Sequence, residues 1–295
     1  MRFSDFYNDR KPAVSFEVFP PKTYETFARL LDIFPRLVAL KPKFMSVTYG
    51  AMGTTQERTL EIAAMILSEY RLDTACHLTC VGASRRQLDE ILSAIYDAGI
   101  RHIVALRGDP PKGETAFIPP ADGLSHADEL VEHIHRFTAH NGTERFGIAV
   151  AGYPEKHVEA PDMATDLLNL KRKVDAGADC VITQLFFDNA LYYRFVEQAR
   201  RVGVGVPIVP GLLPIQSAQQ ILRMTAMCGA TIPSDLRAEL AGAADDDKLA
   251  RKIGVRRCIA QARDLLEHGV PGIHFYVLNR ADLIEQIMAE IQDLL

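Results

Sequence analysis

A short strand pattern followed by an amphipathic helix pattern recurs along the whole chain, and this repeat restricts the fold more than any other feature. Runs rich in β-branched and aromatic residues are typical of strands, whereas apolar residues three and four positions apart indicate helices that cover a sheet. Several helix patterns end at a glycine, such as Gly99 and Gly177, which adopts the left-handed terminal conformation without strain. We predict strands at residues 14–19, 44–48, 74–79, 102–106, 146–151, 180–186, 207–211 and 273–277.

Eight strand–helix units in 295 residues average roughly 37 residues each, a size that suits a (βα)8 barrel. Residues 231–268 exceed one unit, so we expect extra helices before the last strand. No low-complexity linker and no shift in composition divides the chain. We therefore predict an α/β fold, a (βα)8 TIM barrel, as a single domain over residues 1–295.

A doubly wound open sheet is the alternative fold, but it usually carries a glycine-rich phosphate-binding turn between a strand and a helix. The pair Gly203 and Gly205 precedes a strand instead of a helix. Gly108 and Gly113 have the spacing of a P-loop, yet Glu114 stands where that motif needs lysine. The barrel remains the preferred prediction.

Composition and charge exclude several classes of protein. With 48% apolar residues the chain is not disordered, and a net charge of -5 gives no electrostatic reason to expect a nucleic-acid partner. The charged N-terminal segment lacks the apolar core of a signal peptide. The uncharged stretch 202–222 contains three prolines, so we predict a strand and a loop there and no membrane span.

The five cysteines are an odd number without the spacing of a disulfide framework, which indicates reduced thiols and a cytoplasmic protein. Cys76 and Cys80 lie on either side of His77, so a metal site is the alternative interpretation of these two cysteines. No second cysteine pair completes a tetrahedral set, so we expect no metal.

Polar or ionisable residues lie at or near the carboxyl ends of seven of the eight predicted strands. In a (βα)8 barrel these strand ends meet at one face, where active sites lie. Any one of them has a simpler interpretation as a loop cap or a satisfied polar group, but together they predict a polar pocket. The residues are Glu17, Thr48, Tyr49, His77, Arg107, Gly108, Asp109, Tyr153, His157, Gln184, Asn279 and Arg280.

Glu17 is the strongest single signal, because it lies inside an apolar strand. Burial disfavours the ionised carboxylate and is expected to raise its pKa, which makes Glu17 a candidate proton donor near neutral pH. The alternative is a structural glutamate paired with a lysine or arginine of the barrel. Arg107 and Asp109 flank a glycine that would allow a flat ligand to approach the backbone. The alternative interpretation of these two residues is a charge pair that closes a turn.

Nine segments carry a resemblance to a known family: SFEVFPPK, LKPKFMSVTYGA, HLTC, GIRHIVALRGDPP, GYPEKH, DLLNLKRKVDAGAD, TQLFFD, PGLLP and HFYVLNR. In this order and at similar spacing they resemble the methylenetetrahydrofolate reductases, from about residue 15 to residue 280. The resemblance implies a (βα)8 barrel that binds FAD and reduces 5,10-methylenetetrahydrofolate to 5-methyltetrahydrofolate. NAD(P)H would be the electron donor in a ping-pong reaction, with NADH favoured by the bacterial relatives.

The resemblance also implies roles for individual residues. Glu17 would be the general acid that protonates a ring nitrogen of the folate, and Asp109 would lie near the flavin ring, where its charge favours a cationic iminium. The substrate-binding positions would be Glu17, Gln184, Gln220, Met224 and Arg280. The FAD-binding positions would be Thr48, Tyr49, Ala51, His77, Arg107, Gly108, Asp109, His126, Ala127, Tyr153, His157, Asp166, Asn169, Arg172 and Lys173.

Three residues depart from the family pattern. Met224 stands where an aromatic residue often stacks on the folate, His126 replaces a tyrosine near the flavin, and Leu185 replaces a phenylalanine. The chain ends soon after the last barrel helix, so we expect the bacterial type, without a regulatory C-terminal domain. The resemblance further implies a homo-oligomer whose partners are small molecules.

Two alternative functions remain open. One is a flavin-independent barrel that transfers methyl groups from tetrahydrofolate. The other is a reductase subunit that receives electrons from a partner protein.

Overall fold

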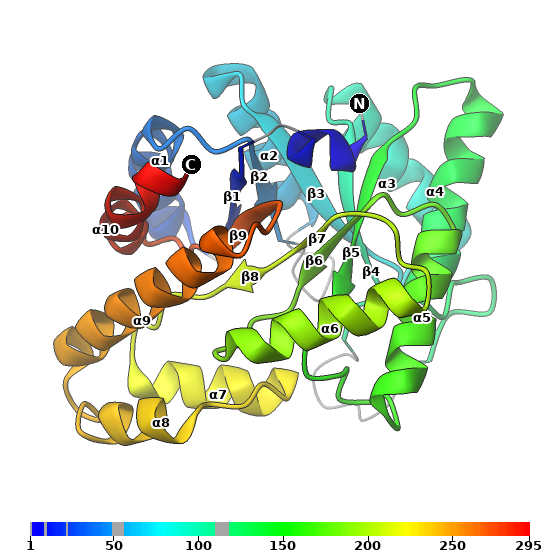
Figure 1. Cartoon of the computed structure of the whole chain (residues 1–295). Coiled ribbons are helices and arrows are strands. Elements are labelled where there is room, and N and C mark those ends of the chain that lie inside the picture. The colour runs from blue at the N-terminus through cyan, green and yellow to red at the C-terminus, as the bar shows by residue number, and fades with distance from the viewer. Residues whose placement is uncertain (1, 9–10, 22, 49–55, 110–117) are drawn as a thin grey trace.

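The computed structural model describes residues 2–8, 11–21, 23–48, 56–109 and 118–295. One parallel sheet has the strand order β7-β6-β5-β4-β3-β2-β1-β9-β8. Its two outermost strands, β7 and β8, follow each other in the chain with only Pro210 between them, so the sheet closes on itself (Figure 1). The strands are β1 (Ala13–Val18), β2 (Phe44–Val47), β3 (Asp73–Thr79), β4 (His102–Leu106), β5 (Gly147–Gly152), β6 (Cys180–Thr183), β7 (Ile208–Val209), β8 (Gly211–Leu212) and β9 (Gly272–Tyr276).

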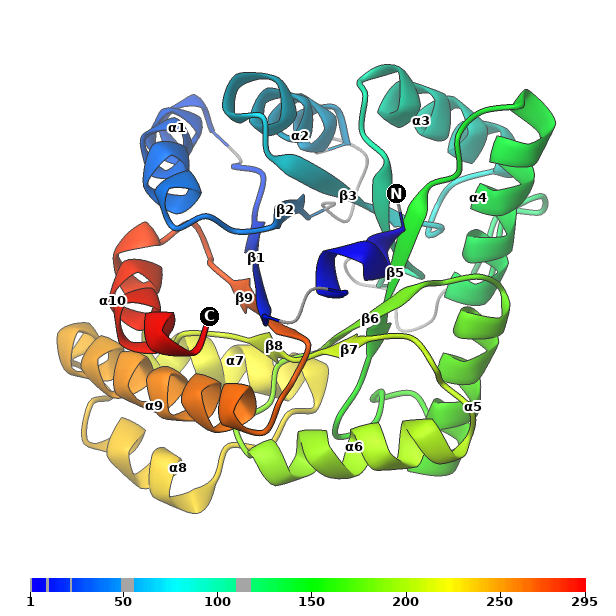
Figure 2. The same cartoon turned by 45° about the horizontal axis from the view of Figure 1, so that its top comes forward.

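Because β7 and β8 are two halves of one strand position, the sheet is a barrel of eight positions with helices around it, and the (βα)8 prediction is confirmed (Figure 2). The expected extra helices before the last strand are α8 and α9. The helices are α1 (Tyr24–Ala39), α2 (Gln56–Tyr70), α3 (Arg85–Asp97), α4 (Ala127–Asn141), α5 (Met163–Asp175), α6 (Asn189–Arg201), α7 (Ala218–Cys228), α8 (Ser234–Ala241), α9 (Asp247–Glu267) and α10 (Ala281–Ile291), with a final 3-10 turn η2 (Gln292–Leu294).

β1, β2 and β6 are buried along their whole length because helices cover the outside of the barrel and side chains fill its inside. The helix-ending glycines are also as predicted. Gly99 has φ +83° and Gly177 has φ +114°, and a side chain at Gly177 would overlap the His135 ring. These residues therefore turn the chain from each helix into the next strand.

The N-terminal opening of the barrel is closed by a short 3-10 helix, η1 (Phe3–Tyr7), which the sequence analysis did not predict. Figure 2 shows it in dark blue across the ring of strands. Phe3 and Phe6 are buried and contact the rings of Phe44 and His102. The backbone N–H of Ser4 donates to Asp179 at 3.0 Å. The sequence did hold an indication of this helix in its apolar residues at positions 3, 6 and 7. The test for a signal peptide does not detect it.

The uncharged stretch 202–222 is not a helix. It contains the turn after α6, then β7, β8 and the first residues of α7, and its prolines lie outside the helices. Among the described residues, no helix combines the length and the apolar character needed to cross a membrane.

Candidate active site

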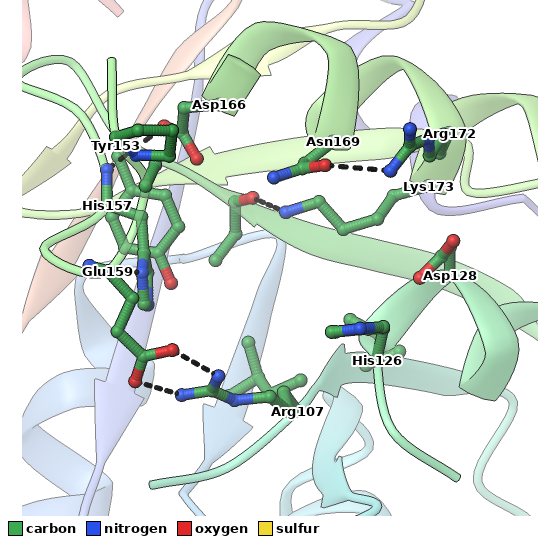
Figure 3. A pocket seen from close by; sticks show the side chains of 16 residues that line it. Arg107, His126, Asp128, Tyr153, His157, Glu159, Asp166, Asn169, Arg172 and Lys173 are labelled. Atoms are coloured by element: carbon green, nitrogen blue, oxygen red, sulfur yellow. Dashed lines mark hydrogen bonds and ion pairs between the residues drawn. The ribbon is translucent and has the colours of Figure 1, made fainter. Parts of the chain in front are cut away.

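A cavity of about 280 Å³ opens at the carboxyl ends of β4 and β5, between the start of α4 and one face of α5 (Figure 3). It brings together nine of the residues predicted from the family resemblance: Arg107, His126, Ala127, Tyr153, His157, Asp166, Asn169, Arg172 and Lys173. Sequence reasoning did not single out the seven others that line it: Ala105, Leu106, Asp128, Ala151, Glu159, Ala160 and Pro161.

One face of α5, which carries Asp166, Asn169 and Lys173 at steps of three and four residues, forms a wall of this cavity. Asp166 is buried and accepts the backbone N–H of His157 at 3.1 Å, so it fixes the loop that follows β5. The Lys173 ammonium donates to the carbonyl of Ala151 at 2.5 Å. Burial lowers the pKa of Lys173 to about 8, an effect that the carboxylates of Asp166 and Asp128 oppose. A buried cation with one neutral acceptor is well suited to an anionic ligand.

The start of α4 supplies a second group of donors to the cavity. His126 is the N-cap residue of α4. Its side chain accepts no hydrogen bond from the first backbone N–H groups of the helix. Helix N-termini of this kind bind phosphate. Together with Lys173 and Arg172 across the cavity, these N–H groups fit the diphosphate of a dinucleotide such as FAD, although the Asp128 carboxylate also lines the wall.

Arg107 forms an ion pair with Glu159, and not with Asp109 across the glycine. Its guanidinium donates to both carboxylate oxygens of Glu159, at 2.5 and 2.7 Å (Figure 3). This contact raises the pKa of Arg107 and lowers that of Glu159. Asp109 is exposed and does not line the cavity. The charge pair thus joins the loops after β4 and β5.

Glu17 is buried in the barrel, with 6% of its surface exposed. In the described part of the chain, its contacts all reach one oxygen, Oε2. The His77 Nε2 lies at 3.0 Å, the Ser46 hydroxyl donates at 3.2 Å and the His274 Nε2 lies at 3.4 Å. Burial raises the pKa of Glu17, but the two imidazoles outweigh it and lower the pKa to about 2.

The expectation of a raised pKa for Glu17 is therefore wrong for the ligand-free protein. The burial was predicted correctly, but the two imidazoles were not considered. The alternative of a lysine or arginine partner is also not observed, because the partners among the described residues are histidines and a serine. His77 does not line the cavity and contacts the carboxylate of Glu17.

His274 is the functional candidate that sequence reasoning missed. It is fully buried within β9, and its register partner on β1 is Ser15, two residues before Glu17. The available signal was a histidine inside the last apolar strand. Its meaning depends on closure of the barrel, which makes the first and last strands neighbours.

The remaining predicted residues lie apart from the main cavity. Gln184 lines a small second cavity beside Tyr153 and Cys228, while Arg280 pairs with Asp282 at 2.7 and 2.9 Å. Thr48 is buried and Gly108 has φ +93°. Gln220 and Met224 lie on α7, and Met224 and Leu185 belong to one apolar cluster. Tyr49 and Ala51 lie outside the described residues.

Cys76 and Cys80 are buried thiols whose pKa values burial raises to about 12. The histidine between them faces Glu17. Within the residues described, no group of three or more histidine, cysteine or acidic side chains is arranged to hold a metal ion.

Comparison with known proteins gives one family. The family model of methylenetetrahydrofolate reductase matches residues 2–292. The chain is 41% identical to 5,10-methylenetetrahydrofolate reductase of Escherichia coli, over 92% of this chain and 87% of the relative. It is 40% identical to methylenetetrahydrofolate reductase (NADH) 1 of Arabidopsis thaliana over 90% of this chain. The chain spans about half the length of that relative and of similar plant proteins, 46% in each case.

Solved structures share the fold at low sequence identity. An uncharacterized protein from Clostridium thermocellum that binds two copies of 5-methyl-5,6,7,8-tetrahydrofolic acid is 16% identical, with a TM-score of 0.63 over 98% of this chain and 97% of that one. Dihydropteroate synthase from Thermus thermophilus is 11% identical, with a TM-score of 0.51 over 98% of each chain. At these identities the likeness supports the barrel fold alone.

Proposed function

Because the chain belongs to the methylenetetrahydrofolate reductase family, we propose that it reduces 5,10-methylenetetrahydrofolate to 5-methyltetrahydrofolate with NADH. The observation that carries this proposal is the 41% identity to the Escherichia coli enzyme over 92% of the chain. The choice of NADH over NADPH follows the names of the plant relatives. The folate-binding neighbour in Clostridium thermocellum is consistent with a folate substrate on this fold.

We propose that the cavity between α4 and α5 holds FAD. When bound, this cofactor would supply the two-electron chemistry that links the nicotinamide to the folate. The start of α4, Arg172 and Lys173 would bind the diphosphate, because they are the cationic and N–H groups that face one another across the cavity. Tyr153 and His157, whose rings meet edge to face at 4.7 Å, would bound the opposite wall.

In this proposal the residues of the chain bind the folate and supply a proton. Gln184, Gln220, Met224 and Arg280 would contact the folate, and Asp109 would stabilise positive charge on it. Glu17 would deliver the proton that opens the five-membered ring at one of its nitrogens. In the described residues nothing hydrogen-bonds to its Oε1, which is the oxygen left for a substrate.

Anaerobic addition of NADH to the purified protein tests this function. A visible flavin absorption band that NADH bleaches, followed by its return when methylenetetrahydrofolate is added, supports the reductase. A protein that binds no flavin when FAD is supplied would favour the flavin-independent methyl transfer. A flavin band that neither NADH nor NADPH bleaches would favour a partner electron donor. Running both nucleotides in parallel decides the donor.

A further inference from the structure

The carboxyl end of the β1–β9 pair is held by a side chain instead of the backbone. The Glu17 carbonyl accepts the N–H of Val277 from the β9 side at 3.0 Å. The Val18 carbonyl accepts the N–H of Thr48 from the β2 side at 3.1 Å. Because alternate residues of a strand bond to the same neighbour, Phe19 is the next residue of the chain that faces β9 (Figure 2).

The side chain of Asn279 makes both bonds of Phe19. The Phe19 N–H donates to the Asn279 Oδ1 at 3.0 Å, and the Asn279 Nδ2 donates to the Phe19 carbonyl at 2.9 Å. The backbone turns away at this point, because the Val277 carbonyl accepts the N–H of Arg280 at 3.1 Å. The two residues after Phe19 are prolines, which have no N–H to offer. The Asn279 amide, which the sequence analysis counted among the pocket groups, thus replaces a backbone pair of the sheet.

The turn that carries Asn279 is strained. Leu278 has φ +50° and Asn279 has φ +56°, so two consecutive residues other than glycine are left-handed. Such conformations persist where neighbouring contacts fix them, and they concentrate at functional sites. Leu278 packs in the apolar cluster that includes Met224 of α7, and its carbonyl lies 3.5 Å from the Gln216 amide nitrogen. The turn therefore connects β1 and β9 with the segment that leads into α7.

On the basis of the proposed function, we propose that Asn279 is a positioning residue that fixes Glu17 and Arg280 relative to each other. It bonds to the backbone two residues after Glu17, and it directly precedes Arg280, which begins α10. The Arg280 guanidinium is held in turn by Asp282, at 2.7 and 2.9 Å. Without the Asn279–Phe19 bonds, the proton donor and the folate-binding arginine would lie on two strand ends that move independently.

Two variants of Asn279 test the proposal. Asn279→Gly adopts the left-handed conformation without strain but loses both bonds. We expect the rate of the folate half-reaction to fall by about 10-fold and the KM for methylenetetrahydrofolate to rise by about 10-fold, because small displacements of reacting groups are costly. NADH-driven flavin reduction should stay within about twofold of the wild type.

Asn279→Asp is the milder change. It keeps the acceptor for the Phe19 N–H, but its carboxylate faces the Phe19 carbonyl with no proton to donate. We expect a fall of about fivefold in the folate half-reaction. Wild-type folate kinetics in either variant, or equal loss in both half-reactions, would overturn the proposal.

Asp179→Ala is the matched control for a role in stability alone. The Asp179 carboxylate also holds two backbone groups from distant segments, the N–H groups of Ser4 and Ile148, but at the N-terminal end of the barrel. We expect it to lower the melting temperature and, at saturating FAD, to leave the KM for methylenetetrahydrofolate unchanged. If it raises this KM as much as Asn279→Gly does, the effect is general destabilisation and the proposal fails.

Hydrogen exchange gives a readout that needs no activity. In the ligand-free protein, NMR should show the Phe19 amide exchanging at least about 10-fold faster in Asn279→Gly than in the wild type. The Thr48 amide, which bonds to the other side of β1, should change by less than about twofold. Equal Phe19 exchange in both proteins would overturn the proposal. If the wild-type protein reduces no folate, the proposed function fails, and this readout still decides whether Asn279 holds the end of β1.

Discussion

A buried carboxylate such as Glu17 is stable in the barrel only because donors converge on it. Taking a lone charge out of water is costly, and the imidazoles of His77 and His274 and the Ser46 hydroxyl offset that cost. The lowered pKa therefore implies a stability contribution from Glu17 that is fully present above its ordinary pKa of 4.5. It is lost as pH falls from there through about 2.

Replacement of Glu17 by glutamine separates its chemical role from its structural one. Glu17→Gln keeps the shape of the side chain but removes the acid, so we expect the folate half-reaction to fall by at least about 100-fold. NADH-driven flavin reduction should stay within about twofold of the wild type. Stopped-flow absorbance of each half-reaction measures both rates. Glu285→Gln, which breaks an exposed pair with Arg36 between α10 and α1, serves as the surface control.

Loss of both half-reactions to the same extent in Glu17→Gln would contradict the general-acid role. At this scale the sequence predicted the burial of Glu17 but not its protonation state. The pattern of one strand reveals burial, whereas the pKa depends on residues from β3 and β9 that only the closed barrel brings to it.

At the scale of elements, α5 illustrates how one helix face can favour ligand binding over stability. Burial lowers the pKa of Lys173 to about 8, so the unfolded chain binds more protons than the folded one between about pH 8 and 10.5. The folded state is therefore relatively more stable above that range than below it. An anionic ligand in the cavity would stabilise the charged, protonated form of Lys173.

Lys173→Met removes this charge and keeps an apolar side chain of similar length. We expect the affinity for FAD to fall by about 10-fold or more, since a buried charge-assisted bond to a phosphate is lost. The melting temperature of the flavin-free protein should not fall. Flavin titration by fluorescence and thermal unfolding measure the two quantities. The control is Lys171→Met, which removes an i,i+4 pair with Asp175 on the same helix. An unchanged FAD affinity in Lys173→Met would exclude the proposed phosphate contact.

The attachment of η1 to the barrel depends on pH. Asp179 accepts backbone N–H groups from Ser4 and Ile148, yet burial raises its pKa to about 6. Because the folded state favours the protonated acid, stability decreases as pH rises from about 3.8 to about 6. We expect Asp179→Asn to cost less stability at about pH 8 than at about pH 4, measured by urea unfolding. An equal cost at both pH values would contradict the raised pKa.

Most elements were predictable because their patterns are local. The strand ends agree with the prediction to within about two residues, except that β6 ends at Thr183 and the predicted strand at 207–211 is divided. Pro210 has no N–H group and interrupts the ladder there. The helix η1 was missed because a segment this short has no periodic pattern of its own, and its burial depends on the open end of the barrel.

At the scale of the whole molecule, the barrel joins its first and last strands, and this closure makes the candidate acid site. Ser15, Glu17 and His274 belong to β1 and β9, which are far apart in the chain but paired in register. The cavity that we propose for FAD depends instead on β4, β5, α4 and α5, which are consecutive. The residues of the second group were traceable through a family resemblance. In the first group only Glu17 was predicted, and its partners Ser15 and His274 needed the three-dimensional structure.

The division at Pro210 has a mechanical consequence. β6 and β7 pair through two residues, and β8 and β9 through two more, whereas β3 and β4 pair through five. The wall of the barrel thus has a weak seam, and His274 lies on it, with its N–H bonded to the Pro210 carbonyl at 3.0 Å.

Hydrogen exchange should detect this seam. We expect the backbone amides of β7 and β8 to exchange at least about 10-fold faster than those of β3 and β4 in the ligand-free protein, because local opening needs fewer bonds to break. Equal protection around the barrel would contradict it. Such local opening would let water reach the buried His274 from the side of the wall, without passing through the cavity between α4 and α5.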